Sequence, residues 1–259
     1  MHVLKLNDNT KTGTLVHSYA VPGLKMKEHI KYFHYILENF NIVAIVGDYG
    51  GGVQFIQALN ASELSSKKKI EIREITTNLD DSENYQECLR EAKTQYNLKE
   101  NKICILRKPT ADWIRKANEL LQANFDHKKI WFASRPLDKA YNLQIKKKID
   151  IDDLKFMPNQ DDEKKSSIKL NIIDFLEHQY DMINYTKNQC ALIQVTSTPQ
   201  GTQTFGLPLN LRRQNGPGKA RKDSYSALIL GNWMVKTYYD MMNVEENPIT
   251  ATFTPVFIS

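Results

Sequence analysis

The sequence predicts a mixed α/β fold in which helices cover a sheet, and three observations lead to this prediction. Short apolar runs alternate with longer amphipathic segments along much of the chain. The 259 residues are 41% hydrophobic and 25% charged, a composition typical of a protein with an ordinary buried core. No apolar run approaches the roughly 20 residues that span a bilayer, and the N-terminus lacks the apolar stretch of a signal peptide. We expect one domain over residues 1–259.

The first part of the chain predicts a strand hairpin, a helix and a buried strand. HVLKL (2–6) and TLVHSYAV (14–21) have the pattern of strands and are joined by a polar turn. Apolar residues then recur at i, i+4 and i+7 between Met26 and Phe40, which predicts an amphipathic helix. IVAIV (42–46) is apolar on both faces, as expected for a strand inside a sheet, and a helix is expected from about Val53.

Strands and helices continue to alternate in the rest of the chain. The helix expected in 109–125 has Pro109 near its start and turns Trp113, Ala117, Leu120 and Leu121 inward. The charged segment 144–167 lacks periodicity, and we expect it to be a mobile surface segment. A tail is expected over about 243–259. The remaining predicted strands are 69–75, 103–106, 130–133, 190–197 and 202–208, and the remaining predicted helices are 82–96, 168–185 and 223–242.

The three cysteines, Cys88, Cys104 and Cys190, are widely separated and form no metal-binding or CxxC pattern. We interpret them as reduced thiols of a cytosolic protein. The six histidines contain no HExxH pair, and the chain has neither a GxSxG motif nor a GxxxxGK[ST] phosphate loop. These absences argue against a zinc protease, a serine hydrolase and a nucleotide-driven motor within these residues.

Positive charge is concentrated in one loop. The net charge is +5, and residues 211–222 hold five basic residues without an acid: Arg212, Arg213, Lys219, Arg221 and Lys222. A basic loop of this kind is either an ordinary solvated loop or a contact surface for a polyanion such as DNA. We predict that these five side chains bind the phosphate backbone.

Two acids stand at positions where a metal ion could bind. Asp48 ends the apolar run NIVAIVGD and is followed by Gly50, Gly51 and Gly52, which leave space beside the carboxylate. Asp223 directly follows the basic loop and precedes an apolar helix. Each acid could instead be a helix N-cap. Because carboxylates with phosphate oxygens are the ligands that Mg²⁺ prefers, we predict that Asp48 and Asp223 are metal ligands and catalytic residues.

The order of these motifs resembles a known family. The segments IVAIVGDYGGGVQFIQALN, KNQCALIQV, QTFGLPLNL and GPGKARKDSYSALILGNW are similar to the C-terminal nuclease domain of the large subunit of tailed-phage DNA-packaging terminases. The resemblance covers most of the chain and is most specific around Asp48 and RKDSYSAL. It implies a ribonuclease H-like mixed sheet flanked by helices. It also implies cleavage of concatemeric double-stranded DNA with two Mg²⁺ or Mn²⁺ ions.

The resemblance assigns Asp48 and Asp223 to the second and third of three family acids. The first family acid lies on a strand that precedes a hairpin like 2–21, and this strand has no counterpart here, so we expect an incomplete N-terminal edge. A gap would then separate two strands with unpaired backbone groups. The missing strand could belong to a longer protein or to another chain. Alternatively, HVLKL could take its place with Asp8 as the acid.

The resemblance also implies partners and a location. The partners would be double-stranded DNA, the terminase ATPase domain or an upstream chain, the portal and the small terminase subunit, with no membrane contact. The site of action would be the host cytoplasm, and the protein would not belong to the mature virion. The alternative functions are a catalytically incomplete DNA-binding or docking module of the packaging motor, and a cofactor-binding α/β enzyme that uses the DYGGG turn.

Overall fold

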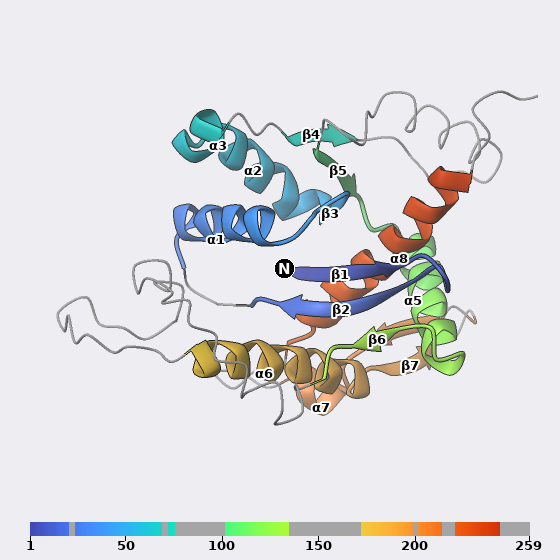
Figure 1. The fold of residues 1–259 in the computed structure, drawn as a ribbon. Helices are drawn as coiled ribbons and strands as arrows, with labels where there is room; N and C mark the ends of the chain where they lie inside the picture. The colour runs from blue at the N-terminus through green and yellow to red at the C-terminus, as the bar shows by residue number, and fades with distance from the viewer. Residues whose placement is uncertain are drawn as a thin grey trace, which may run out of the picture.

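The computed structural model confirms a mixed α/β fold (Figure 1). The expected helix 82–96, the charged segment 144–167, Lys219 and the tail after Asn243 lie outside the described residues. The residues that the structure describes are 1–20, 24–68, 72–75, 102–134, 172–198, 201, 203–213 and 221–243.

The chain begins with the predicted hairpin. Strand β1 (His2–Asn7) pairs antiparallel with β2 (Thr12–Ser18), with a register shift between Val3 and Leu4. The turn places Lys11 in the left-handed region, at a φ of 53°. On its other side, β2 pairs in parallel with the two-residue strand β6 (Trp131–Phe132), so the order of this sheet is β1-β2-β6.

A second sheet of three parallel strands has the order β3-β5-β4. Its strands are β3 (Ile45–Asp48), β4 (Ile72–Ile75) and β5 (Lys102–Arg107). The prediction that β3 lies inside a sheet is wrong for the described residues, because β3 is an edge strand and its side chains are only partly buried or exposed. An apolar run on both faces identifies a strand covered by two layers, but it does not show whether a neighbour lies on each edge.

Three helices come next in the chain: α1 lies between the hairpin and β3, and α2 and α3 follow β3. Helix α1 (Met26–Asn39) matches the predicted amphipathic helix and buries Ile30, Phe33 and Ile36. Helix α2 (Tyr49–Asn60) begins directly after β3, which is four residues before the expected start at Val53. The short helix α3 (Glu63–Lys68) follows, and His34 reaches it through a 3.2 Å hydrogen bond between its Nε2 and the Ser65 hydroxyl.

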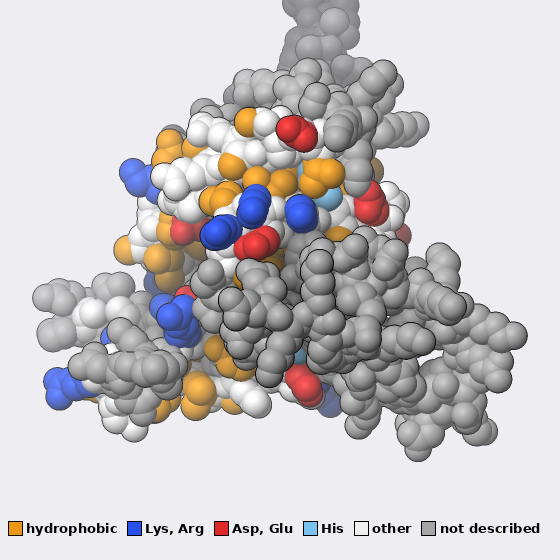
Figure 2. Space-filling model, turned by 90° about the vertical axis from the view of Figure 1, so that its left-hand side faces the viewer, with side chains coloured by type: hydrophobic (Ala, Val, Ile, Leu, Met, Phe, Trp, Pro, Cys, Tyr) orange, Lys and Arg blue, Asp and Glu red, His pale blue; other side chains and the backbone are white. Residues whose placement is uncertain are grey.

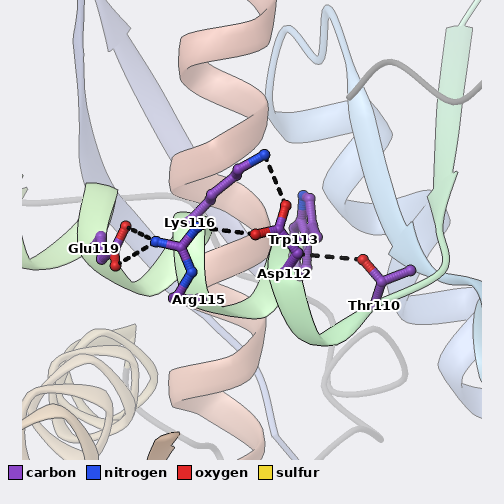
Figure 3. Close-up of polar contacts among 6 residues, drawn as sticks. All are labelled: Thr110, Asp112, Trp113, Arg115, Lys116 and Glu119. Carbon is purple, nitrogen blue, oxygen red and sulfur yellow. Dashed lines mark hydrogen bonds and ion pairs between the residues drawn. The ribbon is translucent and has the colours of Figure 1, made fainter. Parts of the chain in front are cut away.

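Helix α5 (Ala111–Asp126) confirms the helix predicted for 109–125. The Thr110 side chain caps it by accepting a 3.3 Å hydrogen bond from the backbone N–H of Trp113 (Figure 3). On its solvent face, Arg115 contacts Asp112 at 2.9 Å and Glu119 at 2.8 Å, and these exposed ion pairs contribute little stability. The buried face carries Trp113, Ala117 and Leu121, while Leu120 is only partly buried.

The last part of the described chain packs on a central helix. Helix α6 (Ile172–Ala191) precedes an antiparallel hairpin of β7 (Gln194–Ser197) and β8 (Gln203–Gly206), then the short α7 (Leu209–Arg212) and finally α8 (Asp223–Asn243). The prediction of a strand from Cys190 was too long, because Cys190 and Ala191 still belong to α6.

Helix α8 is buried along most of its length and forms the centre of the main hydrophobic cluster. Its Leu228 is fully buried, and Trp233 meets Trp113 of α5 edge to face with ring centroids 5.8 Å apart. Figure 1 shows α8 passing behind β1 and β2, with α5 beside it. The helix thereby holds the hairpin, α5 and α6 together, and its first residue, Asp223, is placed at the surface of this core.

Among the described residues, no helix is both long and apolar enough to cross a membrane.

Candidate functional site

Asp48 lies where the sequence predicted it, at the carboxyl end of a strand. It is the last residue of β3 and the N-cap position of α2, with extended backbone at φ −71° and ψ 134°. Its side chain makes no cap hydrogen bond and is exposed. A carboxylate at a helix N-terminus with free oxygens can accept a cation or a hydrogen-bond donor from a ligand.

The three glycines after Asp48 differ in their surroundings. A Cβ at Gly51 would meet nothing within 4 Å, and one at Gly50 would lie 3.8 Å from Asp48 Oδ2. A Cβ at Gly52 would instead lie 2.8 Å from Leu106 Cδ2 of β5. The expectation of open space is therefore correct for Gly50 and Gly51, whereas Gly52 allows α2 to pack closely on the sheet.

Arg107 is a residue near Asp48 that the sequence reasoning missed. The two residues are register partners at the ends of β5 and β3. The Arg107 side chain is 7% exposed, and its guanidinium lies 5.3 Å from the Trp113 ring centroid and 5.5 Å from that of Trp233. Burial lowers the pKa of Arg107 to about 10, so it stays charged at neutral pH. The sequence signal that could have identified Arg107 was the segment KICILR (102–107), an apolar strand that ends on a cation.

Asp223 occupies a different recess, beside the basic loop. Its carboxylate is highly exposed, at 76%, and lies 3.9 Å from the Arg221 guanidinium. The recess has a volume of about 770 Å³ and is formed by the strand β8, the residue after it and the charged side chains Arg212, Arg221, Lys222 and Asp223. Three of the five predicted phosphate-binding residues therefore share a hollow with Asp223.

Backbone contacts hold two of these cations against β8. Lys222 Nζ donates to the Phe205 carbonyl at 3.5 Å. The Arg212 guanidinium crosses Gly206 so closely that a Cβ there would lie 2.1 Å from one of its terminal nitrogens. Arg213 is exposed at the C-cap of α7, and Lys219 lies outside the described residues.

The structure assigns the two acids to separate recesses. Asp48 borders an apolar slot between β1 and β3, and Asp223 borders the basic recess. Within the described part of the chain, no group of three or more His, Cys, Asp or Glu side chains is placed to hold a metal ion. Asp8 accepts a 3.0 Å hydrogen bond from the Tyr239 hydroxyl, and Asp181 is exposed on α6.

The surface beside α1 and α6 is mixed in character. Figure 2 shows a small group of Lys and Arg side chains around an acidic one, below a band of hydrophobic side chains. Cations and acids lie interspersed on this face.

Comparisons with known proteins give no relative. No family model matches the chain, and neither the curated proteins nor the solved structures include a significant match. Function must therefore be inferred from the residues and their geometry.

Proposed function

We propose that this chain is a metal-dependent endonuclease domain that cleaves double-stranded DNA, equivalent to the C-terminal nuclease domain of a tailed-phage terminase large subunit. The observation that carries the proposal is the basic recess, in which the exposed carboxylate of Asp223 lies 3.9 Å from the Arg221 guanidinium and shares the hollow with Arg212 and Lys222. Cations spaced along a hollow neutralise neighbouring phosphates of a nucleic acid. A carboxylate among them would repel DNA unless a divalent cation lies between them.

The residues divide into two roles. Asp48 and Asp223, which border separate recesses in this structure, would be the metal ligands, and two Mg²⁺ or Mn²⁺ ions would activate the attacking water and stabilise the leaving oxygen. The basic side chains hold the DNA backbone in register without reading its sequence. The hairpin β7–β8 also supports DNA binding, because its β7 strand is exposed along its whole length beside the recess residues of β8.

The finer fold assignment belongs to the same proposal. Two three-stranded sheets with α1 and α8 on their faces are the arrangement that a ribonuclease H-like sheet would have if its middle strand were absent. In this proposal the missing strand and its acid come from the ATPase-bearing upstream part of a terminase. The portal and the small terminase subunit are further partners, and the protein acts on DNA in the host cytoplasm.

The test is cleavage of supercoiled plasmid in the presence of Mn²⁺ by the chain and by Asp48→Asn and Asp223→Asn variants. We expect each variant to lose at least about tenfold in rate, because a two-metal centre loses charge at the scissile phosphate. Asp126→Asn, which changes an exposed aspartate at the end of α5, is the matched control and should cleave normally. Equal cleavage by the wild type and both site variants would refute the assignment.

A second function is favoured by one specific observation, the separation of Asp48 and Asp223 into different recesses without a third ligand among the described residues. The chain would then be a DNA-binding or docking module of the packaging motor without chemistry of its own. This second function predicts salt-sensitive binding of duplex DNA by the wild type and no metal-dependent cleavage. The same plasmid assay, combined with binding measurements, separates the two functions.

A further inference from the structure

A slot of about 770 Å³ lies between the two three-stranded sheets and is lined by residues of both. One side is β1, which lines the slot with residues from His2 to Leu6. The opposite side is the segment from Asn41 to Asp48, which includes β3. In Figure 1, β1 lies between β2 on one side and β3 on the other.

Both strands that border the slot are edges. Among the described residues, β1 pairs only with β2, and β3 pairs only with β5. An edge strand presents a row of backbone N–H and C=O groups that a neighbouring strand can pair with. Two such rows on opposite sides of one slot offer hydrogen bonds to both edges of a single inserted strand. A small molecule or a helix cannot match two ladders at once.

The two edge strands, β1 and β3, also lie in the same layer of the fold. On β1, Leu4 packs in the cluster around α8, and Val3 packs with Tyr32 and Ile36 of α1. On β3, Val46 belongs to the α8 side, and Ile45 belongs to a cluster containing α1 residues. Alternate side chains of both strands thus point to α8 and to α1. The sheets are two halves of a layer between these helices.

The helices close the slot above and below with apolar side chains. Along α8, the lining positions follow the spacing i, i+3, i+4, i+7, i+8 and i+11, which is one helix face: Ala227, Leu230, Gly231, Met234, Val235 and Tyr238. From α1 and the residue after it come Phe33, Ile36 and Phe40. A strand placed here would be covered on both faces, so its side chains must be apolar in both directions.

We propose that this slot is an acceptor site for one β-strand of a second polypeptide. The donor is an extended segment with apolar side chains on both faces and a length similar to the six residues of β1. Any charged residue of the donor lies at an end of the strand, near Lys5 or Asp48, which are the charged side chains among the described lining residues. The apolar remainder of the slot would not solvate a charge. Strand acceptance does not depend on nuclease activity.

A second copy of this chain is a poor donor, because its described strands are already fixed. The N-terminal ammonium donates to the Tyr19 carbonyl at 2.6 Å, and His2 Nε2 donates to the Ser224 carbonyl at 2.8 Å, which ties β1 to the rest of the fold. Releasing β1 to pair with a neighbour would break these contacts and uncover Val3 and Leu4. A separate polypeptide with a free extended segment has no such cost.

The experiment supplies a donor strand and measures its insertion. A Thr-Val-Ile-Val-Val-Thr segment is fused before Met1 through a flexible Gly/Ser linker, which gives it a high local concentration at the slot. Hydrogen exchange of the β1 and β3 amides is then compared with that of the unmodified chain. We expect exchange at both edges to slow by about tenfold or more, together with a higher melting temperature. A donor with its two central residues changed to proline should have neither effect.

A variant in which the slot is filled provides the second part of the experiment. Leu230→Trp places a larger ring in the slot, and in this variant the fused donor should no longer protect β1 or β3, while circular dichroism confirms that the variant is folded. Equal exchange with the donor and the proline control would overturn the proposal.

Two results with the unmodified chain would also overturn it, because they would assign a different occupant. One is edge protection that disappears when residues 244–259 are removed, which would identify the chain's own tail. The other is protection that rises with chain concentration as dimers form in sedimentation, which would identify a second copy.

Discussion

Single residues of the basic recess depend on backbone positions that the sequence does not mark as functional. Gly206 is buried and lies directly beneath the Arg212 guanidinium. Because glycine has no side chain, the guanidinium can occupy the space next to the backbone of residue 206. The sequence identified Arg212 as a candidate because its basic neighbours are adjacent in the chain. It could not identify Gly206 or Arg107, because their roles come from contacts with residues on other elements.

The first prediction follows from this contact. In Gly206→Ala, the new methyl group would overlap a guanidinium nitrogen now 2.1 Å from the Cβ position, so Arg212 must move while the flexible side chain absorbs the clash. We expect weaker binding of a DNA duplex and a salt slope, d log K/d log[salt], smaller by about 1, as for the loss of one phosphate contact. Fluorescence anisotropy at several salt concentrations measures both quantities.

Gly51→Ala is the matched control for this change, because a Cβ at Gly51 meets nothing within 4 Å. It should keep the wild-type salt slope, because it displaces no cation, and stabilise α2 by roughly 0.5–1 kcal/mol, since alanine is a better helix former than glycine. If Gly206→Ala binds DNA with the affinity and salt slope of the wild type, Arg212 does not contact phosphate from its position over Gly206.

At the scale of elements, periodic segments were predicted well and local boundaries less well. The helices α1 and α5 were found because their apolar residues repeat with the helical period over several turns, and α8 was found as a long apolar segment. The end of α6 was placed wrongly, since CALIQV is equally compatible with a strand and with a buried helix end. The gap beside β3 was expected only from the family resemblance, because no local pattern records a missing neighbour.

The second prediction concerns the start of α5. The Thr110 hydroxyl accepts a hydrogen bond from the backbone N–H of Trp113. This cap stabilises the first turn of a helix that buries Trp113 against Trp233. Thr110→Ala leaves that N–H without its side-chain acceptor, and we expect the free energy of unfolding to fall by about 1 kcal/mol. Urea denaturation followed by tryptophan fluorescence measures the change.

The control for the cap is Lys116→Ala on the exposed face of the same helix. Lys116 pairs with Asp112 at 2.7 Å, but both side chains are more than half exposed, at 55% and 59%, so solvent screens the pair. The unfolding midpoint of this variant should shift much less than that of Thr110→Ala. Equal shifts would mean that the cap contributes no more than a surface ion pair.

At the scale of the whole molecule, polar contacts close the fold around its N-terminus. The hydrogen bonds of Met1 and His2 join residues 18 and 222 positions apart, and His17 Nε2 shares a 2.7 Å hydrogen bond with the Tyr32 hydroxyl. The sequence predicted the strands that carry these histidines, but it gave no sign that His17 would be buried and His2 partly buried. Partners so distant along the chain leave no local pattern, and only the assembled layers bring them together.

Buried histidines make the stability of the fold depend on pH. Burial, aided by the nearby N-terminal ammonium, lowers the pKa of His17 to about 4, and the pKa of His2 is lowered to about 4 mainly by burial. In the unfolded chain each has the ordinary pKa of about 6.5. The unfolded state therefore binds more protons below pH 6.5, and the stabilisation present at neutral pH is lost as the pH falls from about 6.5 towards 4.

The third prediction isolates His17. Between pH 7.5 and 5, this residue alone should reduce the free energy of unfolding by about 2 kcal/mol in the wild type. His17→Gln has an amide that can hydrogen-bond the Tyr32 hydroxyl but does not titrate. Between pH 7.5 and 5, the free energy of unfolding of this variant should therefore fall by about 2 kcal/mol less than that of the wild type. Urea denaturation at a series of pH values measures both curves, and His127→Gln, an exposed histidine, should follow the wild type. Parallel curves for the wild type and His17→Gln would show that His17 is protonated as easily in the folded chain as in the unfolded one. The pH dependence would then have to come from other groups.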